Sequence, residues 1–435
     1  MKIKNFFIFL VIFLLNSFLF SQEYKINQVF YEITGSTNQK YLETYLDIDN
    51  DFIFSSKGDF DLFTEKLKTK LNDLRQLDSY EVFSDFVNEV NSDLVLVNLT
   101  IKTTDTKNFI ALPYPKYDSN EGFVAKIKLR DSNLFGTLTE FNSELVYAYT
   151  EKFDHKFGLQ FDFNVPIYFN FLGTNLFSNF ETGYFINEQK FTLDSNSGFE
   201  FFYPIVKPFV KLGFNQIANF NTIYTNVDEW LLSENLFVKF PFYFSDFIFT
   251  FLLNSQWIVL PQYQYTTKLG FNLYKSSVNW ISNFRKGFVL DSSNYVNLFY
   301  DEFSYNFSLE TIFSYYNNFS FLGTYFRVYG FYNPEDFFVG KYIRGITDTT
   351  LNSDFGFISN FDFPISIFKI NKNKWYDFEL QITPFMDLGY ANNFVISGGL
   401  EFLVYPRITR SLQLRASAGI SKNDLELFIG IGLFY

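Results

Sequence analysis

The chain of 435 residues contains no cysteine and a single histidine, His155. The absence of cysteine excludes a disulfide framework, an acylated N-terminal cysteine and thiolate chemistry. His155 has no neighbours in the sequence that would serve as metal ligands or complete a Ser-His triad. A G-x-S-x-G elbow and a phosphate-binding glycine loop are also missing. We therefore expect neither an enzyme nor a bound cofactor or metal ion.

A surplus of basic residues is absent as well. The formal net charge is −12, from 35 Lys and Arg against 47 Asp and Glu. Residues 22–121 carry 18 acidic and 10 basic side chains, so the acidity is concentrated in this first part of the chain. Because no basic face is available to neutralise phosphates, we do not expect a nucleic-acid partner.

Long apolar runs are confined to the N-terminus. Lys2 and Lys4 precede an apolar run over residues 6–20, and polar residues follow from Ser21. This pattern predicts a cleaved secretory signal peptide at 1–21, with an uncleaved anchor helix as the alternative. Because no later run of 18 apolar residues occurs, the sequence predicts no transmembrane helix.

Aromatic residues, in contrast, are abundant. The chain has 64 Phe and 30 Tyr, and aromatic residues make up 23% of it, yet the mean hydropathy is −0.01. One soluble core cannot absorb so many rings. A β-barrel can, because its outer face meets lipid and its two rims carry aromatic girdles.

Residues 22–106 are predicted to form a small α+β domain with the element order β-α-α-β-β. The predicted elements are a strand at 25–34, helices at 39–48 and 59–74, and strands at 79–90 and 94–103. Asp59 is a plausible N-cap of the second helix. Such a unit places both helices on one face of a three-stranded sheet. Residues 107–121, which include Pro113 and Pro115, are predicted to be a linker.

Residues 122–435 are predicted to be an antiparallel transmembrane β-barrel, because apolar and polar residues alternate there with period two, as at 378–383 and 412–420. A soluble β-sandwich would alternate in the same way. The segment from Leu425 to the terminal aromatic Tyr435 is typical of a closing barrel strand, and it would be an aggregation-prone edge in a soluble protein. At 9 to 11 residues per strand plus connections, about 16 strands are expected.

Two early motifs resemble those of a known family. The segment Phe30-Tyr31-Glu32-Ile33-Thr34-Gly35 resembles the first strand of a POTRA (polypeptide-transport-associated) domain. The segment Asp131-Ser132-Asn133-Leu134-Phe135-Gly136 resembles the D-x-N-L-F-G run that ends the first barrel strand in the BamA/TamA superfamily.

Three further segments in the last third carry the same resemblance. They are Ile343-Arg344-Gly345-Ile346, Asn360-Phe361-Asp362-Phe363-Pro364 and Phe385-Met386-Asp387-Leu388-Gly389. They resemble, in order, the superfamily's arginine-glycine motif on an inward-folded loop, the acidic strand motif that follows it, and the F-x-D-x-G strand motif. The resemblance covers essentially the whole chain after the predicted signal peptide, with a single POTRA-like unit.

This resemblance implies an outer-membrane protein that inserts or exports client proteins, with the POTRA-like domain in the periplasm. The implied partners are unfolded client polypeptides, outer-membrane lipid and possible periplasmic proteins that dock on the POTRA-like unit. Two other classes compete with this interpretation. A passive porin or solute channel would not need residues 22–106 or the arginine-glycine loop, and a surface antigen would be expected to have longer loops.

Two site hypotheses follow. In the first, Arg344 pairs with Asp362 and Asp387, since a carboxylate on a barrel strand is tolerated only on the lumen side. The alternative is an ordinary loop arginine and two lumen-lining acids. In the second, Gly430 and Gly432 remove lumen-side packing from the last strand and weaken its closure against a first strand at 123–129. The glycines could equally relieve crowding by the inserted loop.

Overall fold

The protein is described from a computed structural model, which divides into two compact units, Met1–Thr106 and Lys107–Tyr435. The described residues are 22–87, 94–118, 122–150, 154–169, 172–187, 189–203, 210–220, 230–260, 262–334, 339–346, 351–370, 377–406, 412–422 and 424–431. The predicted signal peptide at 1–21 therefore lies outside the described residues. Within the described ranges, neither of the two helices is long and apolar enough to cross a membrane.

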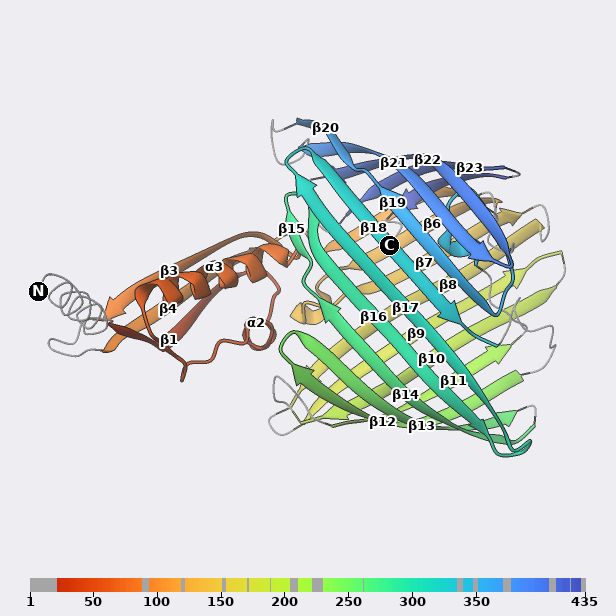
Figure 1. The fold of residues 1–435 in the computed structure, drawn as a ribbon, viewed down its shortest axis with the longest axis horizontal. Coiled ribbons are helices and arrows are strands. Elements are labelled where there is room, and N and C mark those ends of the chain that lie inside the picture. Colours follow the sequence, from red (N-terminus) through yellow and green to blue (C-terminus); the bar gives the residue numbers. More distant parts are fainter. Residues whose placement is uncertain are drawn as a thin grey trace, which may run out of the picture. The chain divides into compact units, whose positions relative to one another are not determined.

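The first unit is an α+β domain in which helix α3 lies along one sheet (Figure 1). Its elements are β1 (Glu23–Thr34), α2 (Gln39–Leu46), β2 (Ile53–Phe54), α3 (Lys57–Asp73), β3 (Leu77–Val87) and β4 (Leu94–Asp105). The sheet order is β2-β1-β4-β3, with β1 parallel to β4 and the other pairs antiparallel. The two-residue strand β2 was not expected from the sequence, and it adds a fourth strand to the predicted three.

Helix α3 begins two residues earlier than predicted. Its N-cap is Ser56, whose Oγ accepts a hydrogen bond from the Asp59 backbone N–H (3.2 Å), so the predicted cap at Asp59 is wrong. The Ser56 hydroxyl in turn donates to Asp59 Oδ2 at 2.8 Å, which places the acid inside the first turn as the partner of the cap.

The core of the first unit lies between α3 and the facing side of the sheet. Alternate residues of β4 point into it, and Val97, Leu99 and Ile101 are fully buried. Phe60 of α3 packs edge-on against Phe54 with ring centroids 5.4 Å apart. Apolar residues that lie three and four positions apart on α3 therefore pack against residues that lie two positions apart on β4, in one core.

The second unit is a closed barrel (Figure 1). Its strands are β5 (Phe109–Asp118), β6 (Gly122–Asp131), β7 (Phe141–Thr150), β8 (Asp154–Tyr168), β9 (Gly173–Phe185), β10 (Lys190–Phe202), β11 (Lys211–Phe220), β12 (Trp230–Phe244), β13 (Phe247–Leu260), β14 (Gln264–Ser276), β15 (Asn279–Ile281), β16 (Phe284–Phe299), β17 (Ser304–Phe319), β18 (Leu322–Tyr332), β19 (Phe355–Asp362), β20 (Ile365–Ile370), β21 (Phe378–Ala391), β22 (Asn393–Pro406), β23 (Leu414–Ser421) and β24 (Leu425–Ile431). We call the end of the barrel where β5 begins the near end, and the opposite end the far end.

The described barrel has eighteen strand positions rather than about 16. Twenty strand elements, β5 to β24, appear in the closed order. The short β15 pairs with the first residues of β16, while β14 pairs with β16 directly. The elements β19 and β20 both lie between β18 and β21 and share one position. The estimate was low partly because residues assigned to a linker belong to the wall.

The prediction of a linker at 107–121 is wrong, because residues 109–118 form β5. This strand pairs with β6 at ten positions and closes the barrel against β24. Pro113 and Pro115 are two residues apart, so their missing N–H groups fall on the same edge of β5. The Ser132 N–H donates to the Asn108 carbonyl at 3.0 Å, so in this register the even-numbered residues of β5 bond to β6 and both prolines face β24, where their missing donors are tolerated.

The closing contact, which we call the seam, therefore joins β24 to β5 and not to residues 123–129, which lie in β6. Among the described residues, β24 and β5 share two Cα partner pairs, Phe428 with Asp118 and Ile429 with Tyr117.

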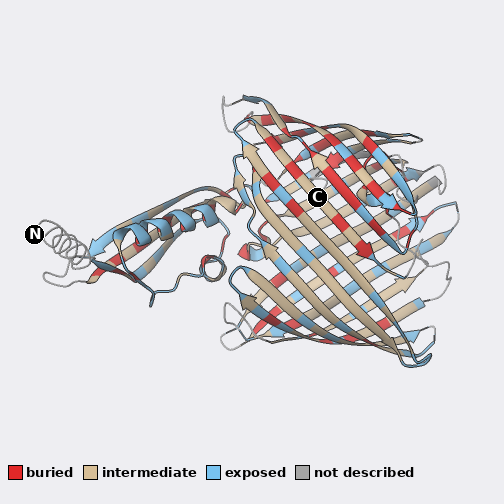
Figure 2. Ribbon diagram, in the orientation of Figure 1, coloured by how far each residue is buried: buried red, intermediate tan, exposed pale blue. Residues whose placement is uncertain are grey.

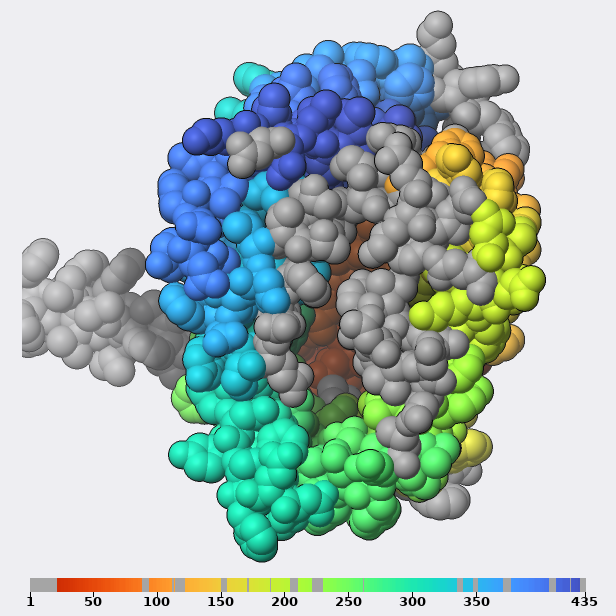
Figure 3. Space-filling view, turned by 90° about the vertical axis from the view of Figure 1, so that its right-hand side faces the viewer, coloured from red at the N-terminus to blue at the C-terminus, as the bar shows by residue number. Residues whose placement is uncertain are grey.

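The two faces of the barrel wall differ in chemistry. On β22 the outward residues Phe394 and Ile396 are 63% and 54% exposed, whereas Ser397 and Glu401 on the inward face are buried. An apolar outer face around a polar interior is the pattern of a barrel surrounded by lipid. Figure 2 shows the buried residues of the barrel gathered on β18 to β22. Figure 3 looks into the far end and shows a hollow between the blue wall and the yellow-green wall.

Candidate functional site

The connection between β18 and β19 folds back into the barrel. Its described part includes the short 3₁₀ turn η2 (Gly340–Tyr342) and the residues that follow. Val339, Ile343 and Ile346 are almost fully buried against an apolar cluster on the inner face of β18, β19 and β21. Gly389 of β21 makes room for this packing, because a Cβ at that position would collide with Ile343 Cδ1.

Arg344 lies at the tip of this loop and is 2% exposed. Its Nε and Nη2 donate to the two carboxylate oxygens of Asp387 on β21, at 2.9 and 2.7 Å, and its backbone N–H donates to Asp387 Oδ2 at 2.9 Å. Nη2 also donates to Asp362 Oδ1 on β19 at 2.5 Å. The guanidinium lies over the Phe385 ring at 3.8 Å. This fork of donors satisfies two buried carboxylates at once.

A second arginine extends the network toward the seam. Arg415 of β23 donates from Nε to Glu401 Oε2 of β22 at 2.6 Å, and the same oxygen lies 3.9 Å from Arg344 Nη1. The Arg415 guanidinium lies over the Phe428 ring of β24 at 4.6 Å. The three charged groups, Arg344, Glu401 and Arg415, are buried in the barrel interior, where unpaired charges would be costly. The inner face from β19 to β24 therefore holds one connected charge network.

Gly345 brings the loop backbone against β23. It has φ +85°, a conformation that favours glycine. A Cβ on Gly345 would lie 2.7 Å from the Ile420 backbone nitrogen, and one on Gly419 would lie 2.7 Å from the Gly345 nitrogen. The Gly345 N–H donates to Glu426 Oε2 of β24 at 2.6 Å. The glycine following Arg344 thus allows the loop to reach the last described strand.

The structure brings Arg344, Gly345, Asp362 and Asp387 together, as the first hypothesis required. Four other members of the network were not singled out from the sequence; they are Glu401, Arg415, Gly419 and Glu426. The sequence held a signal for them, because each of the four residues occupies an inward position in the alternating pattern of its strand. The sequence alone did not show which inward positions share a partner.

The predicted first-strand motif lies elsewhere, in the turn between β6 and β7, so it follows the second strand of the barrel. Asp131 Oδ1 accepts from the Asn133 N–H at 2.9 Å, and Asn133 Oδ1 accepts from the Leu138 N–H at 2.8 Å. Gly136 has φ +75°. Phe135, in the middle of the turn η1 (Leu134–Gly136), is 82% exposed. These side chains hold the shape of a turn.

The predicted seam residues are described in part. Gly430 is buried and lies on the inward side of β24, where a Cβ would lie 2.7 Å from the Phe428 ring. Gly432 and Tyr435 lie outside the described residues.

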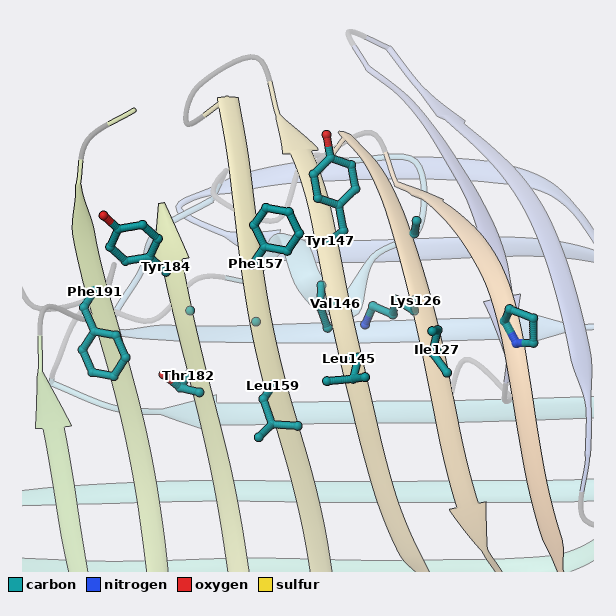
Figure 4. Close-up of a pocket in the computed structure, with 14 residues that line it drawn as sticks. Lys126, Ile127, Leu145, Val146, Tyr147, Phe157, Leu159, Thr182, Tyr184 and Phe191 are labelled. Atoms are coloured by element: carbon teal, nitrogen blue, oxygen red, sulfur yellow. The ribbon is translucent and has the colours of Figure 1, made fainter. Parts of the chain in front are cut away.

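One cavity of the barrel lies on its outer wall. It has a volume of about 790 Å³ and is lined by outward side chains of β6 to β10, including Ile127, Leu145, Phe157 and Tyr184 (Figure 4). Its apolar lining matches the lipid-facing surface around it. Over the part of the chain that the structure describes, no group of three or more His, Asp or Glu side chains is placed to hold a metal ion.

No protein-family model and no curated protein sequence matches the chain. Solved structures do. CdiB from Acinetobacter baumannii aligns with a TM-score of 0.50 and 12% identity over 94% of this chain and 74% of its own. CdiB from Escherichia coli aligns with a TM-score of 0.51 and 9% identity over 94% and 76%. A BamA structure from Haemophilus ducreyi lacking POTRA domains 1–3 aligns with a TM-score of 0.40 and 10% identity over 94% and 84%. The chain has the fold of the two CdiB structures.

Proposed function

We propose that this chain is an outer-membrane protein of the BamA/TamA type that inserts or exports client polypeptides. In this proposal the first unit is a single POTRA domain in the periplasm and the second unit is the conducting or inserting barrel. The observation that carries the proposal is the Arg344 loop, which folds into the barrel and pairs with Asp362 and Asp387. The CdiB-like fold over 94% of the chain supports it.

The physical cost of this loop favours a polypeptide handler over a passive pore. Removing charges from water costs several kcal/mol per ion, so a buried ion pair gains little net stability compared with an apolar contact. Such a pair does define one arrangement of the loop, because any other arrangement leaves buried charges unpaired. A solute channel needs a polar lumen, but it does not need a loop held in a single position.

The first unit offers a place for a client segment. β3 is the last strand of the sheet order, so its outer edge is where an added strand would continue the sheet. We propose that an extended client segment pairs there before it reaches the barrel. No nucleotide or cofactor is required, since the folding of a client strand into lipid is itself favourable.

The seam is the proposed exit toward lipid. Closure there has two weaknesses: the prolines of β5 remove backbone donors on the edge that faces β24, and Gly430 removes a side chain from the inner face of β24. Missing donors and reduced side-chain packing at one place lower the cost of opening the barrel there. The sequence indicated the role of Gly430, whereas the contribution of Pro113 and Pro115 depends on the place of β5 in the wall.

The proposed function is tested by depleting the protein and comparing the outer-membrane and secreted proteomes. A broad loss of barrel proteins would indicate assembly, and the loss of one secreted protein would indicate dedicated export. An unchanged proteome would contradict both and favour a channel.

A disulfide across the seam tests the exit. Tyr117 and Ile429 are Cα partners, so the pair Tyr117→Cys and Ile429→Cys is placed for a bond in a chain without other cysteines. We expect the oxidised form to lose client handling and the reduced form to regain it. The matched control is Phe123→Cys with Tyr149→Cys, which are partners on β6 and β7 away from the seam. Equal activity of the oxidised seam variant and this control would exclude lateral opening.

A further inference from the structure

A second segment folds into the barrel from the near end. Residues 277–287, which we call the hairpin, connect β14 to the wall part of β16. Trp280 and Arg285 are partners within the hairpin, whereas β16 pairs with β14 only from Val289 onward. Figure 1 shows β15 at the near end of the barrel.

The bend into the barrel depends on Gly287. Its φ is +123°, and the carbonyl oxygen of Ser277 occupies the position that a Cβ would need. The Ser277 N–H donates to the Phe288 carbonyl at 2.9 Å, so the two legs of the hairpin meet where they leave the wall. At the other end, Ser282 turns the hairpin with φ +57°. The hairpin is therefore a defined structure with a narrow base.

Two residues anchor the hairpin to the neighbouring strands. Phe284 is 1% exposed and packs with Tyr316 of β17 and Tyr325 of β18. The Arg285 backbone N–H donates to the Tyr325 hydroxyl at 2.9 Å, and Arg285 Nη1 donates to the Tyr316 hydroxyl at 3.2 Å. The guanidinium lies 4.3 Å from the centre of the Tyr316 ring.

The tip of the hairpin reaches β21, farther along the wall. Asn283 Nδ2 donates to Glu379 Oε2 at 2.9 Å, and Gln381 Nε2 donates to the Asn283 carbonyl at 3.3 Å. Three strand positions separate β16 from β21 in the barrel order. Glu379 and Gln381 are buried on the same face of β21 as Asp387, so the contact runs across the interior and not around the outside.

The hairpin also closes the near-end side of the Arg344 network. A cavity of about 10 Å³ lies between them, lined by Asn283 and Arg285 from the hairpin and by Asp362 and Glu401 from the network. This volume admits about one water molecule. The hairpin therefore lies beside the carboxylates of the network at the near end.

From this geometry we infer that the hairpin is an internal latch, which an extended polypeptide must displace to enter the barrel from the near end. The inference rests on the proposed function, because it names the segment that the client replaces. The contacts suit replacement: an extended segment offers a backbone N–H to Tyr325 and a C=O to Gln381, as the hairpin does now, and its N–H groups can replace the Asn283 side-chain amide at Glu379. The narrow base at Ser277 and Gly287 supplies the hinge.

The test measures ion conductance of the purified full chain in planar bilayers, without any client. The variant Asn283→Ala with Arg285→Ala removes the hydrogen bond to the Glu379 carboxylate, the hydrogen bond to the Tyr316 hydroxyl and the contact of the guanidinium with the Tyr316 ring. We expect about a tenfold rise in open-state occupancy, which corresponds to the loss of at least one charge-assisted hydrogen bond. The matched control is Lys286→Ala, which removes a positive charge from an exposed position of the same hairpin. Unchanged conductance in a folded double variant would overturn the latch.

A second variant covers the case in which the double variant fails to fold. Asn283→Cys with Gln381→Cys can be joined by a short reducible thiol crosslinker, because the chain has no other cysteine. Crosslinking the two cysteines should abolish the open-state current, and reducing the crosslinker should restore it. Open-state currents that persist after crosslinking would exclude the latch. Conductance needs no client, so this result is independent of the depletion experiment. A latch effect with an unchanged proteome would refute only the polypeptide role.

Discussion

Two sides of the barrel place charged residues on their inner face in different ways. On β6 to β9 the partners come from neighbouring strands and stay partly exposed: Lys126 and Glu144 are 2.6 Å apart with each side chain 13% exposed. On β19 to β24 the partner comes from a loop, and the Arg344 and Asp387 side chains are at most 1% exposed. Ion pairs of the same kind are thus in contact with water on one side and covered on the other. The second side is covered because the Arg344 loop folds in from the far end and the hairpin at 277–287 folds in from the near end.

This difference decides how much each charge matters. Accessible pairs contribute at most about 1 kcal/mol, since water and salt screen them. Breaking a buried pair by removing one partner costs about 3–5 kcal/mol, since the other charge stays buried and unpaired. Substitutions of similar size on the two sides should therefore differ widely in their effects.

The largest effect is expected for Arg344→Ala. It leaves Asp362 and Asp387 without their arginine and should release the loop, at a cost of about 3–5 kcal/mol, with loss of client handling in a complementation assay. Arg344→Lys should rescue little, because an ammonium group cannot reproduce the fork. The control is Arg130→Ala, whose partner Glu140 lies on the accessible side. Complementation by Arg344→Ala at the level of Arg130→Ala would remove the basis of the proposed function.

The next effect concerns the close approach of the loop and β23. Gly419→Ala inserts a methyl group 2.7 Å from the Gly345 nitrogen and should push the loop tip away, costing about 1–3 kcal/mol as overpacking does. Limited proteolysis of the loop in folded protein would detect this release. Gly330→Ala on β18 is the control, since its Cβ would meet nothing within 4 Å. Equal protease resistance of the two variants would show that the loop tolerates displacement.

A smaller effect is expected where the network reaches the seam strand. Glu426→Gln keeps an acceptor for the Gly345 N–H but removes the charge, so the loss should be about 1 kcal/mol. The rate at which the pair Tyr117→Cys and Ile429→Cys forms its disulfide should then differ from the rate in the same pair without Glu426→Gln, because the position of β24 changes. An unchanged rate would mean that the loop does not influence the seam.

The smallest effect is expected for Lys126→Ala on the accessible side. Its partner Glu144 keeps Lys128 at 3.2 Å and contact with water. Client handling and the midpoint of thermal unfolding should change little, within about 1 kcal/mol. A loss comparable to that of Arg344→Ala would abolish the distinction between the two sides.

Much of the fold was predictable because it depends on local periodicity. The period of two in the barrel and the spacing of Phe60, Leu67 and Leu71 in α3 both place apolar residues on one face, and the structure follows them. The misassigned linker had a physical cause. Pro113 and Pro115 disfavour a strand interior, but they are acceptable on an edge whose partner pairs weakly, and the sequence does not show which edge that is.

The sequence by itself determined that the strands would alternate between an apolar and a polar face. It also identified Arg344, Asp362 and Asp387 as candidates for pairing with one another. Only the tertiary structure decided that Glu401, Arg415 and Glu426 join the same network and that the hairpin at 277–287 covers it from the near end. The reason is that alternation is a property of one strand, whereas shared partners depend on barrel closure, which sets the strand order and the register between strands.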